Sequence, residues 1–364
     1  MTQVDPAELK QLGREAGLDA VGVAPAAPFL ATRVHLGERR DAGLHGGMQF
    51  TYRNPDRSTD PDRALAGAQS IVVGALAYPA PTRRAGRGPR GRVAAYACSD
   101  HYAVLRQSLS VIAERLREMG WQTLVLVDDN ALVDREAAYR AGLGWYGKNS
   151  NLLLPGRGSW FVLGSVVTTA PLAPDDAPMA DGCGACRRCI SGCPTGAIVA
   201  PGIVDARRCL AWLLQMSGDF PRQYRVALED RIYGCDDCQE VCPQNERVGA
   251  GDAGTVPKEA SVSITEMLTA DDATLLAGHE RWYIAERSPR YLRRNALVVL
   301  GNIGDPHGSA VVQLVERYLD DPDAMLRSHA AWAARRLGRD DLLVGRDTDP
   351  AIVAELAEPA PATR

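Results

Sequence analysis

The chain has 364 residues, of which 46% are hydrophobic, and a formal net charge of −4. This length is sufficient for two or three domains, each with a core of its own, and the composition excludes a disordered chain. No run approaches the roughly 20 apolar residues of a membrane span, and the acidic, amphipathic residues 1–17 contain no apolar secretory region. We therefore expect a cytoplasmic protein without membrane contact.

The first 174 residues alternate helix-like and strand-like runs. Apolar residues recur at helical spacing over 104–119, whereas residues 124–127 form a short apolar run suited to a buried strand. This pattern predicts one α/β domain over 1–174. The Pro/Gly/Arg stretch 79–92 predicts a surface loop, with a contact to a polyanion as the alternative.

Eight of the nine cysteines fall within residues 183–242, which in a reducing compartment indicates metal rather than disulfides. The first four have the C-x2-C-x2-C-x3-C-P spacing of bacterial ferredoxins, in which three thiolates hold one [4Fe–4S] cluster and the fourth reaches the other. The second set lacks one closely spaced ligand, which the isolated Cys209 can supply. The predicted ligand sets are Cys183, Cys186, Cys189 and Cys242 for one cluster, and Cys193, Cys209, Cys235 and Cys238 for the other. Two structural zinc sites are the alternative.

The C-terminal part is helical in pattern and contains an internal repeat. The segment from Leu292 resembles the segment from Leu326 at an offset of 34 residues (326 − 292), close to the period of helical-pair repeats. We expect a ferredoxin-like domain over 175–250, a linker over 248–257, short HEAT-like repeats over 256–345 and a tail over 346–364.

The segment 127–168, VDDNALVDREAAYRAGLGWYGKNSNLLLPGRGSWFVLGSVVT, precedes the cysteine pattern and DRIYGCDDCQEVCPQN. Together they resemble the tRNA epoxyqueuosine reductases, over residues 15 to 340. The resemblance implies a base-off cobalamin held between a nitroreductase-like α/β domain and a ferredoxin-like α+β domain with two [4Fe–4S] clusters, followed by HEAT-like helical repeats that help to hold tRNA. It implies reduction of epoxyqueuosine to queuosine at the wobble position of the tRNA anticodon. We also expect an external low-potential electron donor and a monomer.

The resemblance also assigns site residues. Asp134 takes the role of proton donor, whereas an aspartate at a helix start is otherwise an N-cap. The loop around His101 and Tyr102 is one residue shorter than the family pattern, so the resemblance assigns these two side chains no role. For Cys98 a small buried hydrophobe is the alternative to a cofactor contact. The implied cobalamin contacts are Arg57, Cys98, Asp100, Asp134, Lys148, Ser159, Thr169 and Ser217.

An arginine-rich run lies between residues 281 and 294, with five arginines and one acid, Glu286, giving a local charge of +4 (5 − 1). Arg290, Arg293 and Arg294 fall at i, i+3 and i+4 and would share one helix face. We predict that this face binds tRNA phosphates, with a solvated helix face as the alternative.

Two other classes of function fit part of the pattern. A corrinoid reductive dehalogenase would share the cofactors, but it is expected to carry a twin-arginine signal, which the N-terminal segment lacks. A non-catalytic iron–sulfur electron carrier would explain the cysteines but not the α/β domain.

Overall fold

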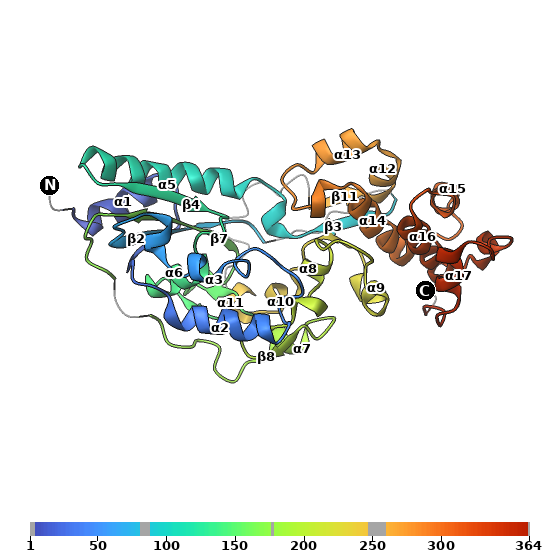
Figure 1. The fold of residues 1–364 in the computed structure, drawn as a ribbon, viewed down its shortest axis with the longest axis horizontal. Coiled ribbons are helices and arrows are strands. Elements are labelled where there is room, and N and C mark those ends of the chain that lie inside the picture. Colours follow the sequence, from blue (N-terminus) through green and yellow to red (C-terminus); the bar gives the residue numbers. More distant parts are fainter. Residues whose placement is uncertain (1–3, 81–87, 176–177, 247–259, 363–364) are drawn as a thin grey trace. The chain divides into compact units, whose positions relative to one another are not determined.

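The computed structural model describes residues 4–80, 88–175, 178–246 and 260–362 (Figure 1). These fall into two compact units. Unit 1 takes its described residues from 1–80, 99–207 and 236–255, and unit 2 takes its own from 81–98, 208–235 and 256–364. No helix in the described ranges is long and apolar enough to cross a membrane.

The two units divide the chain differently from the predicted domains. The cysteine-rich region contributes residues 208–235 to unit 2 and the rest of its described residues to unit 1. The region is divided because it bonds to residues of both units. Its strand β10 (Arg231–Tyr233) pairs with β3 (Arg90–Val93) in unit 2. Its Cys238 carbonyl accepts a hydrogen bond from Asn149 in unit 1. The linker predicted over 248–257 lies outside the described residues.

Unit 1 is built on a four-stranded antiparallel sheet of order β1-β2-β7-β4. The apolar run 124–127, which predicts a buried strand, belongs to this sheet. Its elements are α1 (Pro6–Glu15), β1 (Ala20–Pro25), α2 (Leu30–Asp41), α3 (Pro55–Ser58), α4 (Pro61–Ala64), β2 (Ser70–Ala77), α5 (His101–Glu118), β4 (Thr123–Val127), α6 (Asp134–Arg140), β5 (Trp145–Tyr146), β6 (Leu152–Leu153) and β7 (Phe161–Thr168).

Helices cover both faces of this sheet. In Figure 1, α1 and α5 lie on one face and α6 lies on the other. The leucines predicted at helical spacing in α5 are buried, and Leu109 packs so closely over the sheet that a Cβ on Gly164 would lie 2.8 Å from its side chain. The two-sided cover explains why β2 and β7 are apolar along almost their whole length.

The cysteine segments of unit 1 form short elements beside this core. They are α7 (Arg188–Ser191), the hairpin strands β8 (Ile198–Ala200) and β9 (Ile203–Val204), α10 (Asp237–Glu240) and α11 (Pro243–Glu246). The whole chain is therefore a mixed α/β protein, as predicted.

Unit 2 combines a small mixed sheet of order β10-β3-β11 with a helical region. Strand β3 occupies the end of the stretch 79–92 that we expected to be a loop, and residues 81–87 of that stretch lie outside the described residues. The other elements are α8 (Leu210–Leu213), α9 (Arg222–Leu228), β11 (Ser261–Ser263), α12 (Ile264–Thr269), α13 (Asp272–Gly278), α14 (Arg290–Ile303), α15 (Ser309–Leu319), α16 (Ala324–Arg336) and α17 (Pro350–Leu356).

The 34-residue repeat corresponds to equivalent positions on α14 and α16. Leu292 and Leu326 are both buried, and Ala296 and Ala330 are fully buried. The predicted tail 346–364 is not a plain tail: Asp349 caps α17, and Ile352 of that helix is buried in the core of unit 2. The helix packs on α16 because its apolar side chains would otherwise be exposed.

Candidate functional site

Asp134 is the first residue of α6, directly after the loop that leaves strand β4. Val133 holds the N-cap position, and no side chain caps the helix. Asp134 is half-buried as a whole, but its Oδ1 atom is buried and has no hydrogen-bond partner among the described residues. Because a cap would need a bond from this carboxyl to a backbone N–H, the N-cap alternative is wrong.

Two neighbouring carboxyl groups share this loop with Asp134. Burial raises the pKa of Asp134 well above its usual value, and the negative charges of Asp128 and Asp129 raise it further, while Arg135 opposes them. Burial also raises the pKa of Asp128, which has a left-handed backbone with φ of 51°. The site can therefore keep a proton on Asp134 at a pH where an exposed aspartate has lost it.

Helix α3 lies against the start of α6. The Val133 N–H donates to the Ser58 carbonyl at 3.0 Å, so the two short helices are joined next to Asp134. Arg57, the neighbour of Ser58, is exposed. The structure thus brings two of the predicted cofactor residues, Arg57 and Asp134, onto adjoining segments.

A buried tyrosine that the sequence did not reveal lies in the same unit. Tyr78 follows β2, and its ring is 5.2 Å from the ring of His101. Burial raises its pKa well above the usual value, and the charges of Asp236 and Tyr102 add to the effect, while a hydrogen bond with Gln239 opposes it. A tyrosine at the end of an apolar strand looks like core, so only its contacts with segments distant in sequence identify it.

The turn at residues 147–150 contacts both cysteine segments of unit 1. Lys148 Nζ donates to the carbonyls of Gly184, at 2.5 Å, and Cys186, at 2.9 Å. The side-chain amide of Asn149 donates to the Cys238 carbonyl at 3.2 Å. The Lys148 ammonium, predicted to contact the cobalamin, is thus bonded to the backbone of a cysteine loop.

Four of the predicted ligands group together in unit 1. Burial raises the pKa of the Cys189 thiol, and the charges of Cys183, Cys242 and Cys186 raise it further. Four soft thiols that destabilise one another's thiolate charge suit a cationic iron–sulfur core. Of the other four, Cys193 and Cys238 belong to unit 1, and Cys209 and Cys235 belong to unit 2.

The remaining predicted cofactor contacts have protein partners or lie elsewhere. Asp100 caps α5 by accepting from Ala103 N–H at 2.9 Å, and the Cys98 thiol is buried and donates to the Ala94 carbonyl, as the small-hydrophobe alternative expects. The Ser159 hydroxyl donates to Gln239 at 2.9 Å. Thr169 pairs with Gln122 before β4, at the opposite end of that strand from the loop leading to Asp134.

The prediction that Arg294 lies on an exposed helix face that binds phosphate is wrong, because Arg294 is 0% exposed. Its guanidinium donates to the carbonyls of Met216 and Gly218, which flank the exposed Ser217, and also to those of Leu213 and Leu214. Burial lowers its pKa to about 10. Arg294 points inward because α14 is buried on nearly all sides.

The other two arginines of that face are paired with acids. Arg293 is largely buried and bonded to Asp272 and to the Ala270 carbonyl. Arg290 has a 43% exposed side chain and forms an ion pair with Asp323 at 2.9 Å. Neither presents a free guanidinium face of the kind we predicted for phosphate.

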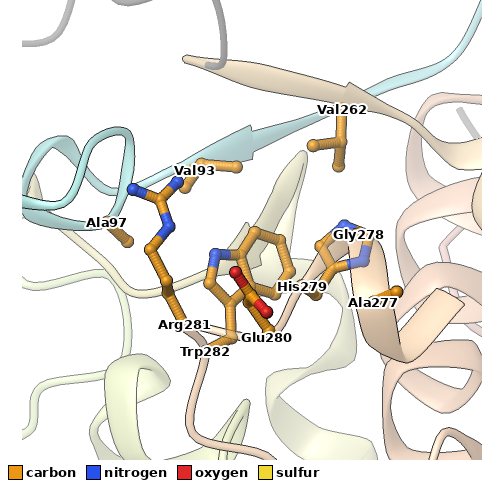
Figure 2. Close-up of a pocket in the computed structure, with 9 residues that line it drawn as sticks. All are labelled: Val93, Ala97, Val262, Ala277, Gly278, His279, Glu280, Arg281 and Trp282. Atoms are coloured by element: carbon orange, nitrogen blue, oxygen red, sulfur yellow. The ribbon is translucent and has the colours of Figure 1, made fainter.

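A cavity of about 310 Å³ lies in unit 2 between the small sheet and the turn at residues 277–282 (Figure 2). Val93 and Val262 line it from the strands, and Figure 2 shows Trp282 and Arg281 along the turn. The indole of Trp282 stacks on Tyr233 with ring centroids 4.3 Å apart. Arg281, the first arginine of the predicted run, is thus an exposed residue at the cavity wall.

Comparisons with known proteins identify the family. Residues 182–245 match the model of the 4Fe-4S double cluster binding domain, and residues 58–129 match the model of epoxyqueuosine reductase QueG. The epoxyqueuosine reductase of Bacillus anthracis is 33% identical and is aligned over 94% of this chain and 91% of its own. That of Vibrio cholerae is 32% identical, with 90% of each chain aligned.

Solved structures give the same result. An epoxyqueuosine reductase crystallised with an epoxyqueuosine-modified tRNA-Tyr stem loop superposes with a TM-score of 0.83, at 29% identity and 96% coverage of both chains. The Bacillus subtilis enzyme, solved with its Asp134 catalytic loop swung out of the active site, also has a TM-score of 0.83, at 28% identity and 96% coverage of both chains. A relative above 30% identity over nearly the whole length, together with the cysteine and aspartate arrangement described above, places this chain in the epoxyqueuosine reductase family.

Proposed function

We propose that this chain reduces epoxyqueuosine to queuosine at the wobble position of tRNA. Family membership supports the reaction, and the observation that carries it is Asp134, whose buried Oδ1 has no partner in the described protein. Opening and removing an epoxide breaks both C–O bonds and leaves a C=C double bond. The oxygen departs as water, which requires two electrons and two protons.

Asp134 supplies a proton to the departing oxygen. A general acid must hold its proton at the working pH, and burial with two neighbouring carboxylates provides this for Asp134. In the Bacillus subtilis relative the catalytic loop also carries an aspartate, which supports the role of Asp134 as the acid.

We propose that a base-off cobalamin binds beside Asp134 and supplies the reducing cobalt centre. Arg57 fits a polar edge of such a group, because it is exposed on the helix that adjoins α6. Ser217 is exposed on the turn held by Arg294 and remains a candidate contact. The two [4Fe–4S] clusters of the family domain would receive their electrons from an external low-potential donor. We also propose that the enzyme is a monomer.

The reaction is tested by nucleoside mass spectrometry. Anaerobically purified enzyme with cobalamin and a chemical reductant is expected to convert epoxyqueuosine in a tRNA anticodon stem loop to queuosine. No conversion in the complete mixture, with eight irons per chain present, would contradict the proposed function.

The ligand sets predict a selective effect of Cys209→Ala. Because Cys209 is assigned with Cys193, Cys235 and Cys238, the variant should lose or alter that cluster and keep the one held by Cys183, Cys186, Cys189 and Cys242. Iron analysis and EPR of the reduced protein measure this. Full iron content with parental spectra would remove Cys209 from the ligands, and Cys98→Ala, which lies outside both sets, is the control.

We propose that the helical region is HEAT-like and that its tRNA contact lies at the cavity wall rather than on α14. Arg281 is exposed there, and the nearby Tyr283 is 58% exposed and suited to stacking on an unpaired base. We expect Arg281→Ala to weaken stem-loop binding and to reduce the salt dependence by about one unit of log–log slope. Arg290→Ala, which removes an arginine paired with Asp323, is the matched control. Equal slopes for the parent and Arg281→Ala would place the RNA elsewhere.

A further inference from the structure

The turn that joins β5 and β6 has a shape that only a few residues allow. Gly147 N–H donates to the Asn151 carbonyl at 2.8 Å, and Ser150 has a left-handed φ of 65°. A Cβ at Gly147 would lie 2.7 Å from Oδ1 of Asn149. The contact disfavours any side chain at position 147, and the Gly147–Asn151 hydrogen bond closes the turn that carries Lys148 and Asn149.

These two side chains reach two cysteine segments that are far apart in sequence. The Lys148 ammonium bonds the carbonyls of Gly184 and Cys186, within the first ligand loop. Asn149 is 6% exposed and bonds the carbonyl of Cys238. The backbone carbonyl of Lys148 also accepts from Gly202 N–H at 3.0 Å, which ties the turn to the β8–β9 hairpin.

We propose that Lys148 is a positioning residue that holds the Cys183–Cys186 loop and, through its charge, raises the reduction potential of the cluster bound there. Asn149 anchors the neighbouring Cys238 segment to the same turn. The proposal rests on the ligand assignment of Cys183, Cys186, Cys189 and Cys242, and it does not depend on the tRNA substrate.

The physical reason is electrostatic. A [4Fe–4S] cluster with four thiolate ligands is an anion, and one-electron reduction makes it more negative. A cation one hydrogen bond from the backbone of a ligand stabilises the reduced form more than the oxidised form, although solvent around the exposed Gly184 and Cys186 reduces the effect. Removing that cation therefore makes the cluster harder to reduce. Lys148 would thus help to set which of the two clusters accepts an electron first.

The test is a dithionite titration of the anaerobic holoenzyme followed by EPR, with iron analysis on the same samples. Lys148→Gln should keep eight irons and lower the midpoint potential of one cluster by ~59 mV, which corresponds to a tenfold change in its one-electron equilibrium constant. Lys148→Arg keeps the charge and should retain a potential close to the parent's. Lys10→Gln, which removes a lysine paired with Asp175 in the same unit, should leave both potentials unchanged.

Unchanged potentials in a fully loaded Lys148→Gln protein would overturn the proposal. If Lys148→Gln loses four irons, the Lys148→Arg variant decides the matter. A Lys148→Arg protein with eight irons and the parental potential supports the role of the charge. The same protein with a clearly lowered potential overturns the proposal. The readouts involve neither tRNA nor cobalamin, so a failure here is distinct from a failure of the proposed function.

Discussion

Replacing Asp134 by Asn is expected to lower queuosine formation by about 10²–10⁴-fold, the range typical of a lost general acid. Asn has nearly the same shape, so the fold and both clusters should persist. The measurement is the rate of queuosine formation in a stem loop under saturating reductant, with iron content and the cobalamin spectrum recorded on the same preparation.

The same substitution should stabilise the protein at neutral pH. The folded pKa of Asp134 is raised, so its contribution to stability is full below the unfolded pKa of about 3.9 and is lost as pH rises through the folded value. Asn has no such ionisation. The apparent Tm of Asp134→Asn minus that of the parent should therefore grow as pH rises from 5 to 8.

A matched control separates this behaviour from loss of a helix cap. Asp271 caps α13 by accepting from Thr274 N–H at 2.8 Å, and Asp271→Asn should change neither activity nor the pH trend of Tm, because Asn caps a helix nearly as well. An Asp134→Asn enzyme with near-parental turnover would remove the acid role. A Tm difference that shrinks with rising pH would contradict the buried, protonated carboxyl.

Local patterns predicted much of unit 1. The apolar run 124–127 lies in β4, and the helical spacing over 104–119 corresponds to α5. Each of these signals is the spacing of apolar residues within a single element, and periodicity records it wherever in the sequence the burying partner lies. The helical start at Asp134 was also predictable, but the unpaired state of its carboxyl was not, because it depends on burial from several segments.

Long polar side chains were the main source of error. Lys148 is predicted to contact the cobalamin and Arg294 to contact RNA, yet each bonds backbone carbonyls of a segment more than 30 residues away. Periodicity places Arg290, Arg293 and Arg294 on one face of a helix, but it does not tell whether that face meets solvent or another part of the protein. Only the packing of α8 and the following turn against α14 decides it.

The second large effect is expected from Arg294→Ala, a loss of about 3–5 kcal/mol in the free energy of unfolding, because each buried carbonyl left without a donor costs about 1–3 kcal/mol. Four carbonyls of residues 213–218 would lose the guanidinium donor, and of these Leu214 keeps a bond from the side-chain amide of Asn295. The carbonyls of Met216 and Gly218 lie in a turn outside any helix or strand. Lys in place of Arg should recover little of this, because one ammonium does not match the planar fork that spans these carbonyls. Denaturant unfolding of the purified variants measures the difference.

Arg290→Ala is the matched control on the same helix, since it removes a half-exposed arginine with one ion pair and should cost less than about 1 kcal/mol. At temperatures where Arg294→Ala remains folded, its stem-loop affinity should keep the parental dependence on salt, because a guanidinium without solvent exposure releases no counterion from RNA. A flattened salt slope in the folded variant, with stability close to the parent's, would instead return Arg294 to the RNA-binding surface that its position in the arginine-rich run first indicated.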